Sequence, residues 1–162
     1  KEYVEMQNKK TDHVLESVRE FSNNKYGVDV FKLESPVNVN KITDSDLNAF
    51  KEMGDIAGRP WVMLSAGAGK EEFKKVLKLA FKAGCSGFLA GRAIWLDAFK
   101  HYPNWDKIQT QLESSAKDYL YEIGEIADQT ALSWNKHGCY GKDGSQFLYD
   151  NQDFRLHYNE IE

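Results

Sequence analysis

Residues 61–92, WVMLSAGAGKEEFKKVLKLAFKAGCSGFLAGR, decide the fold class. The apolar run 61–65 ends in the small-residue turn 66–69, and residues 70–83 then carry apolar side chains at helical spacing. Gly84 is a typical helix stop, and a second apolar run, 86–90, follows it. A strand, a glycine-rich turn, a helix and another strand form the repeating unit of a parallel α/β sheet, so we predict an α/β fold.

The same order of elements begins earlier in the chain. Residues 28–33 (VDVFKL) form a short strand-like run, and the segment from Thr43 to Gly58 reads as a helix with its cap and its stop. The region from Tyr3 to about Asn23 has the spacing of an amphipathic helix. We therefore predict three parallel strands, each followed by a helix.

The C-terminal third differs from the rest. Asn104 is a typical N-cap for a long helical segment from Trp105 to about Trp134. Residues 136–162 contain scattered glycines and aromatics, which predicts an irregular tail packed on the same domain. We thus divide the chain into 1–135, the βα units with a helical extension, and 136–162, the tail.

Composition excludes several classes of protein. The 162 residues are 41% hydrophobic and 28% charged, as expected for a globular protein with a core. The net charge of −4 argues against a nucleic-acid binder, and no apolar run approaches the ~18 residues of a membrane span. The two cysteines, Cys85 and Cys139, fit a reducing cytoplasm. The four histidines lack metal-ligand spacing, so we expect surface or packing roles for them and no metal.

Lys32 is the most informative single residue. Strand alternation places it on one face with Val28, Val30 and Glu34, and we expect that face to point inward. A lysine in such a place is costly unless it is paired or held partly neutral, and only the neutral amine attacks a carbonyl to form a Schiff base. An ion pair with Glu34 or with another acid at a strand end is the alternative.

Two glycine-containing turns follow the second and third strands. Ser65 to Gly69 and Ala90 to Arg92 both lead into helices, whose first N–H groups can bind an anion, and arginine can bind phosphate with two hydrogen bonds. In parallel barrels the loops after the last two strands often hold phosphate. Tight βα turns also need glycine without any ligand, and the presence of two such turns, one with arginine, favours a phosphate site.

Three segments together resemble one enzyme family. VFKLESPVN (30–38), LSAG (64–67) and GFLAGRAIW (87–95) are similar, in this order, to motifs of the class I tagatose-1,6-bisphosphate aldolases, a family that includes the sulfofructose-phosphate aldolases. The resemblance covers about residues 14–135. It implies a (β/α)8 TIM barrel that cleaves ketose (bis)phosphates to dihydroxyacetone phosphate and an aldehyde through a lysine Schiff base, without a metal or other cofactor.

Residue by residue, the resemblance implies a Schiff-base role for Lys32 and makes Glu34 a partner that orients it. It also implies a phosphate-binding set, which consists of Ser65, Gly67, Gly91 and Arg92.

The chain departs from this family in three places. The family's catalytic glutamate and a further active-site lysine lie on strands before the Lys32 strand, and no segment before Val28 can hold them. The connection from Pro36 to Pro60 is shorter, and the tail after Trp134 is longer. A closed barrel needs ~250 residues, so we predict the C-terminal part of a barrel, three strands with their helices and a helical extension.

From these residues we predict a cytoplasmic class I aldolase whose isolated chain is weakly active or inactive. Its partners would be a sugar phosphate and either the missing barrel half or a second copy, with no nucleic acid and no membrane. One alternative is a non-enzymatic module that binds a phosphosugar for regulation. Another is a different Schiff-base barrel enzyme, such as a deoxyribose-phosphate-type aldolase or a transaldolase.

Overall fold

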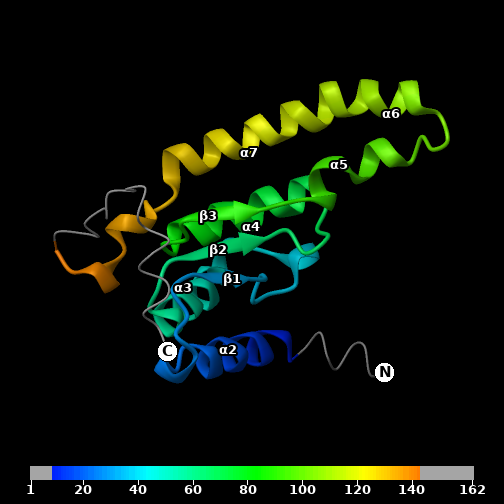
Figure 1. Cartoon of the computed structure of the whole chain (residues 1–162). Helices are drawn as coiled ribbons and strands as arrows, with labels where there is room; N and C mark the ends of the chain where they lie inside the picture. The colour runs from blue at the N-terminus through cyan, green and yellow to red at the C-terminus, as the bar shows by residue number, and fades with distance from the viewer. Residues whose placement is uncertain (1–8, 143–162) are drawn as a thin grey trace.

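The computed structural model describes residues 9–142 as three strands and a series of helices (Figure 1). The longer elements, in chain order, are α2 (Lys10–Phe21), β1 (Phe31–Leu33), α3 (Leu47–Ala57), β2 (Trp61–Leu64), α4 (Lys70–Lys82), β3 (Gly87–Leu89), α5 (Arg92–Phe99), α6 (Trp105–Gln111), the π-helical turn Leu112–Ala116 and α7 (Lys117–Thr130). Short 3-10 turns lie at Asn24–Tyr26, Val39–Lys41, Asp44–Asp46, Trp134–Lys136 and Gly138–Tyr140.

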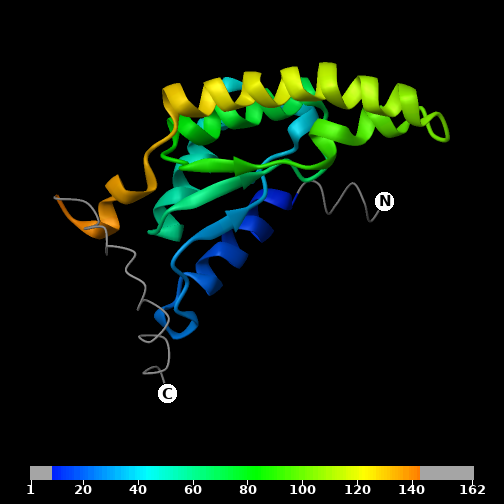
Figure 2. The same cartoon turned by 45° about the horizontal axis from the view of Figure 1, so that its top comes forward.

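The three strands form one parallel sheet in the order β1-β2-β3. Phe31 on β1 lies opposite Trp61 on β2, and Val62 on β2 lies opposite Gly87 on β3. The prediction of three parallel strands with helices between them is therefore confirmed. Within the described residues the sheet is open, with β1 and β3 at its edges, as Figures 1 and 2 show.

The first strand is shorter than predicted, because it begins at Phe31 rather than at Val28. The Phe31 N–H donates to the Pro60 carbonyl at 2.9 Å, and this is the first bond of the β1–β2 ladder. In this register, the next hydrogen bond toward the N-terminus of β1 would be donated by the backbone N–H of residue 60. Residue 60 is a proline and has no N–H. The sequence of the neighbouring strand thus sets where β1 starts.

One face of the sheet is covered by helices. Phe31, Leu33, Trp61 and Met63 point to this face, and each is less than a tenth exposed. Figure 1 shows α3 and α4 behind the sheet and α2 beside β1. The helices supply apolar side chains to the same core, among them Val14, Leu15, Val18, Phe50, Met53, Phe73, Val76 and Leu77. This burial is the main source of stability in the described part of the chain.

Within the described residues the opposite face of the sheet is open, so Lys32 is exposed there and is not buried with its valine neighbours as expected. Lys32 and Glu34 are exposed, and Val30 is 54% exposed. The alternation was predicted correctly, since Lys32 does lie on the face opposite Phe31 and Leu33. The helices of the described residues cover only the Phe31 side, so the Lys32 side meets solvent.

The C-terminal helices lie on the outer side of α4 and α5. α6 and α7 run on as one long helix through the π-helical turn, and the helix ends at Thr130 because Ala131 is extended. This end comes a few residues before the predicted Trp134. The chain then stays attached to the core, since the Leu132 N–H donates to the Cys85 carbonyl at 3.0 Å. Most of the predicted tail 136–162 lies outside the described residues.

Within residues 9–142, none of the helices combines the length and the apolar character that crossing a membrane requires.

Candidate active site

The carboxyl ends of the three strands lie together at one end of the sheet, because the strands are parallel. The strand arrows in Figure 1 point to this carboxyl-terminal end of the sheet. Glu34 to Asn38 follow β1, Ser65 to Gly69 follow β2, and Ala90 to Arg92 follow β3. The structure therefore gathers the sequence-predicted site residues at this end, and parallel α/β proteins bind their ligands at this position.

Lys32 is the middle residue of β1 and lies beside Val62 in the sheet register. It lines a cavity of about 430 Å³ between β1 and α2. The lining also includes Glu34, which follows β1, Leu64 of β2, and Lys10 and His13 of α2. Among residues 9–142 no carboxylate lies within ion-pair distance of the Lys32 amine. The alternative of a Lys32–Glu34 ion pair is thus not found, and the amine is accessible to a ligand.

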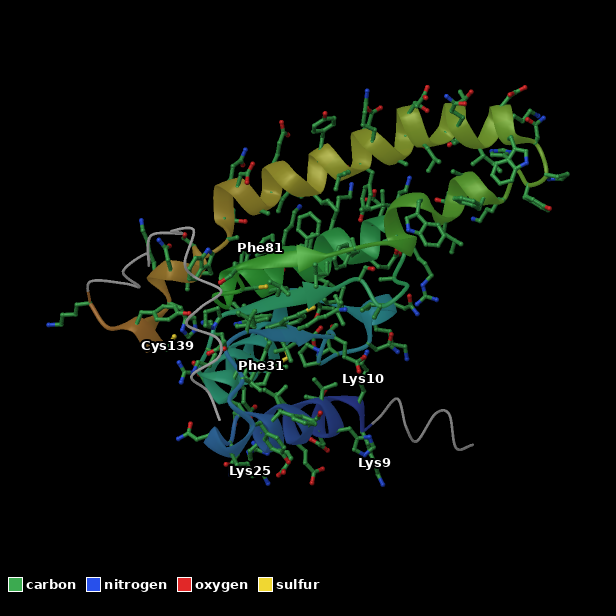
Figure 3. The ribbon with its side chains drawn as sticks, viewed as in Figure 1. Lys9, Lys10, Lys25, Phe31, Phe81 and Cys139 are labelled. Atoms are coloured by element: carbon green, nitrogen blue, oxygen red, sulfur yellow. The ribbon has the colours of Figure 1, made fainter. Side chains whose placement is uncertain are left out.

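Glu34 has a different ionic partner from the one that the sequence suggested. Its Oε2 lies 3.2 Å from the Nζ of Lys10, the first residue of α2. Figure 3 labels Lys10 at the start of α2, on the side that faces the sheet. The ion pair ties the end of β1 to the start of α2 and keeps the Glu34 carboxylate occupied.

The turn after β2 has an unusual backbone. Ala66 has φ 47° and Gly67 has φ 80°, and a positive φ is rare for alanine and frequently marks a functional site. The Ser65 N–H donates to the Leu89 carbonyl at 3.1 Å, so it extends the sheet and is not available to a ligand. What Ser65 can still offer a phosphate is its hydroxyl, although the residue is only 6% exposed.

Gly67 and Arg92 come together across the two turns. A Cβ on Gly67 would lie 3.5 Å from a terminal nitrogen of Arg92, an ordinary contact distance, so the guanidinium lies over the turn. A Cβ on Gly91 would lie 3.4 Å from the Trp95 indole nitrogen, which is a tight fit. Arg92 is exposed and stands at the start of α5. Two of the four predicted phosphate residues are thus neighbours in space.

A second cavity, of about 420 Å³, opens in front of the β2 turn. Its lining includes Lys10, Asn38, Gly67 and Gly69, and Gly69 is the N-cap of the 13-residue helix α4. The positive end of the helix dipole and a lysine favour an anion here. We call the turn Ser65–Gly69 with Arg92 the cradle.

One carboxylate competes with an anion at the cradle. The Glu72 side chain folds back against Gly69, and its Oε2 occupies the place where a Cβ of residue 69 would be. Glu72 is the third residue of α4, where carboxylates are favoured by the helix dipole. A phosphate at the α4 N-terminus would have to displace this carboxylate, whereas one on the Gly67–Arg92 side would not.

Sequence reasoning missed Lys10, and it expected a surface or packing role for His13, which is exposed in the structure. Both lie on α2 and line the cavity that contains Lys32. The apolar spacing predicted a helix from Tyr3, which placed Lys10 in the middle of that helix. A correct prediction of the helix start would have placed Lys10 at the end that faces the site. In the described part of the chain, no three His, Cys, Asp or Glu side chains group as metal ligands.

Comparison with known proteins supports the motif resemblance. The sequence profile of the DeoC/LacD family aldolases matches residues 2–97, which is more than half of the chain. The chain is similar to the tagatose 1,6-diphosphate aldolase of Listeria monocytogenes serotype 4a (strain HCC23), with 32% identity over 143 residues. It is also 33% identical over 147 residues to the tagatose 1,6-diphosphate aldolase 1 of Enterococcus faecalis (strain ATCC 700802 / V583).

The lengths of these proteins differ from that of the chain. The alignments cover 78% and 82% of the chain but only 42% and 44% of the two relatives. A third relative, the tagatose 1,6-diphosphate aldolase 2 of Streptococcus agalactiae serotype III (strain NEM316), is 29% identical with 45% coverage. The chain thus spans less than half the length of the curated relatives that it matches.

Proposed function

Because the chain belongs to the DeoC/LacD family of aldolases, we propose that it carries the Schiff-base lysine and the phosphate site of a class I ketose-phosphate aldolase. The substrate class is a ketose (bis)phosphate such as tagatose 1,6-bisphosphate, which the names of the similar proteins support. The observation that carries the proposal is the position of Lys32. It stands with an accessible amine in the strand beside β2, whose turn forms the cradle.

The proposed reaction begins at Lys32. Its neutral amine attacks the ketone carbonyl, water leaves, and an iminium forms. A base removes the proton of the C4 hydroxyl, the C3–C4 bond breaks, and the electron pair moves into the iminium to give an enamine and a free aldehyde. Protonation at C3 and hydrolysis then release dihydroxyacetone phosphate and restore the lysine.

The cradle would position the substrate for this attack. Arg92 can hold a phosphate with two hydrogen bonds, and the Ser65 hydroxyl and the glycine backbone of the turn can add further donors. A phosphate held there fixes the distance between the ketone carbon and the Lys32 amine, which replaces a random encounter with a bound geometry.

The acid/base group is not among the residues that we assign. The family resemblance places a glutamate on a strand before β1, so we propose that residues outside the described part supply it. We expect the 162-residue chain by itself to be weakly active or inactive. We expect a protein that also contains the proposed preceding strands, here called the full-length protein, to be active.

The same reasoning extends to the fold. Val30 is 54% and Leu89 is 46% exposed on the open face, and the β1 and β3 edges are unpaired within the described residues. Exposed apolar strands with free edges require a partner in a stable protein. We propose that further strands pair along these edges to complete a (β/α)8 barrel, either from the same protein or from a second copy.

Borohydride trapping tests the function directly. The full-length protein is mixed with dihydroxyacetone phosphate, reduced with borohydride, digested and analysed by mass spectrometry. We expect the reduced adduct on Lys32 and on no other lysine, and none in Lys32→Arg, because the guanidinium keeps its charge and cannot form the imine. Lys25→Arg is the matched control, since Lys25 lies in the 3-10 turn Asn24–Tyr26 after α2, in an ion pair with Glu20.

An unmodified Lys32 in a protein that cleaves ketose phosphates would overturn the Schiff-base assignment. Phosphate-ester binding without any adduct and without cleavage would favour the regulatory module instead. Turnover of deoxyribose phosphate in preference to ketose bisphosphates would identify the other Schiff-base enzyme.

A further inference from the structure

We propose that Lys10 is a positioning residue of this site, which exchanges its ion pair with Glu34 for an ion pair with the phosphate of the substrate. The inference rests on the proposed function above, because it needs the cradle to bind a phosphate. It adds a residue that the motif resemblance does not include, and it gives the Lys10–Glu34 ion pair a role in the site.

Lys10 lies where the two cavities of the site meet. Its side chain contributes to the lining of the cavity that contains Lys32 and also to that of the cavity in front of the cradle. Among the described lining residues it is the one that both cavities share. A cation in this position can reach the carboxylate at the end of β1 or an anion at the turn after β2.

The present partner of Lys10 is held weakly enough to be replaced. The side chains of Lys10 and Glu34 are 22% and 50% exposed, and their charged atoms lie 3.2 Å apart. A half-exposed ion pair contributes little net free energy because water competes for both charges. A phosphate dianion carries more charge than a carboxylate and has more acceptor oxygens, so it is the stronger partner.

Release of Lys10 changes what Glu34 can do. Glu34 follows Lys32 by two residues, so in an extended chain both side chains project from the same face. Without Lys10, the Glu34 carboxylate becomes free to pair with the cationic iminium at Lys32. Phosphate binding at the cradle thereby prepares the environment of the reacting lysine.

The direction of this coupling is testable with inorganic phosphate as the probe. Phosphate is titrated calorimetrically into the full-length protein and its variants. We expect Lys10→Met to weaken binding about tenfold, the loss of one charge-assisted contact. We expect Glu34→Gln to tighten binding about threefold, because the carboxylate no longer competes for the lysine.

In the Lys10→Met background, Glu34→Gln should have no effect on phosphate affinity. Lys10→Arg should retain most of the affinity. Lys9→Met is the matched control, because Lys9 is the exposed neighbour that Figure 3 labels on the other side of the helix start, and its variant should bind phosphate like the wild type.

A role in folding alone would weaken binding in both single variants, and that result would overturn the inference. Unchanged affinity in Lys10→Met would also overturn it while leaving the cradle intact. Absence of phosphate binding in the wild type would overturn both. Circular dichroism of each variant separates these outcomes from unfolding, and the borohydride experiment reports on Lys32 independently.

Discussion

The two faces of the three-stranded sheet differ in what they contact. On the covered face, Phe31, Trp61 and Met63 are almost completely buried against α3 and α4. On the other face, Lys32 is exposed and Val62 is half-buried, although these two residues are the immediate neighbours of the buried ones in their strands. Side chains at neighbouring positions of one strand therefore have different roles. Those on the covered face stabilise the core, and those on the open face are accessible to a ligand.

The comparison teaches that the alternation of a strand assigns side chains to faces but not to environments. A face is buried only when another element covers it. The helices of the described residues cover one face, and the chain spans less than half the length of its relatives. The open face is accordingly where we propose both the chemistry and the contact with further strands.

The largest difference between the faces is expected in stability. Met63→Ala removes a fully buried side chain and should lower the free energy of unfolding of the 162-residue chain by about 2–5 kcal/mol. Val62→Ala, at the adjacent position, should cost less than about 1 kcal/mol because its side chain is only half-buried. Urea unfolding followed by circular dichroism measures both values.

The same pair of variants tests whether the open face is covered in the full-length protein. If further strands close a barrel, the cost of Val62→Ala should rise toward that of Met63→Ala. Equal small costs for Val62→Ala in both forms would contradict the proposed barrel. If Val62→Ala and Met63→Ala both lowered the free energy of unfolding of the 162-residue chain by the same large amount, the Val62 face could not be open in that chain.

A smaller effect is expected at the cradle. Arg92→Met should weaken phosphate binding by about tenfold or more, since a guanidinium that faces the turn at Gly67 is removed. Glu72→Gln should strengthen binding slightly, because the carboxylate against Gly69 opposes an anion there. Calorimetric titration with inorganic phosphate measures both changes, and Lys82→Met on the far end of α4 is the control.

An effect of opposite sign at Glu72 would show that its carboxylate organises the turn rather than competing with the anion. Unchanged binding in Arg92→Met would remove Arg92 from the proposed phosphate site.

The smallest effect concerns how α7 holds the start of α4 on the covered side. The Tyr119 hydroxyl donates to the Lys70 carbonyl at 3.0 Å, and Lys74 bridges Glu71 and Glu122 at 2.7 Å each. Tyr119→Phe should lower the free energy of unfolding by about 1 kcal/mol, the usual value of one hydrogen bond. Thermal unfolding at neutral pH measures the difference, and Tyr121→Phe, an exposed residue of the same helix, should have no effect.

The pH dependence gives this prediction a second measurement. Burial raises the pKa of Tyr119 from its ordinary 10.0 to about 12, so the folded state favours the neutral phenol. This contribution to stability is complete below pH 10 and is lost as the pH rises toward 12. Tyr119→Phe should therefore lose less stability than the wild type over this interval. Burial also raises the pKa of Cys85 to about 12, but that residue is present in both proteins and cancels in the comparison.

Much of the fold was predictable because its signals are local. The runs 61–65 and 86–90 and the stops at Gly58 and Gly84 indicated strands and helices whose order the structure confirms. The start of β1 was not predictable from its own residues. It depends on Pro60, just before the neighbouring strand β2, because this proline cannot donate the next ladder bond.

Part of the candidate site was predictable, because its motifs are also local signals that follow the predicted strands. Motif residues after β2 and β3 were expected to lie together, and the structure places the Arg92 guanidinium beside Gly67. The partner of Glu34 was not predictable, because Lys10 lies 24 positions earlier and no pattern in the chain links the two. The exposure of Lys32 within the described residues was not predicted either, because exposure depends on what covers the sheet.

The sequence by itself determined the α/β class, the three parallel strands, the family and the residues to which the chemistry is assigned. These depend on hydrophobic periodicity, glycine positions and motif order, which are properties of consecutive residues. Only the tertiary structure decided which face of the sheet is open, that Lys10 holds Glu34, and that Lys10 is shared by two cavities. These depend on distances between segments far apart in the chain, and such distances are set by packing rather than by local pattern.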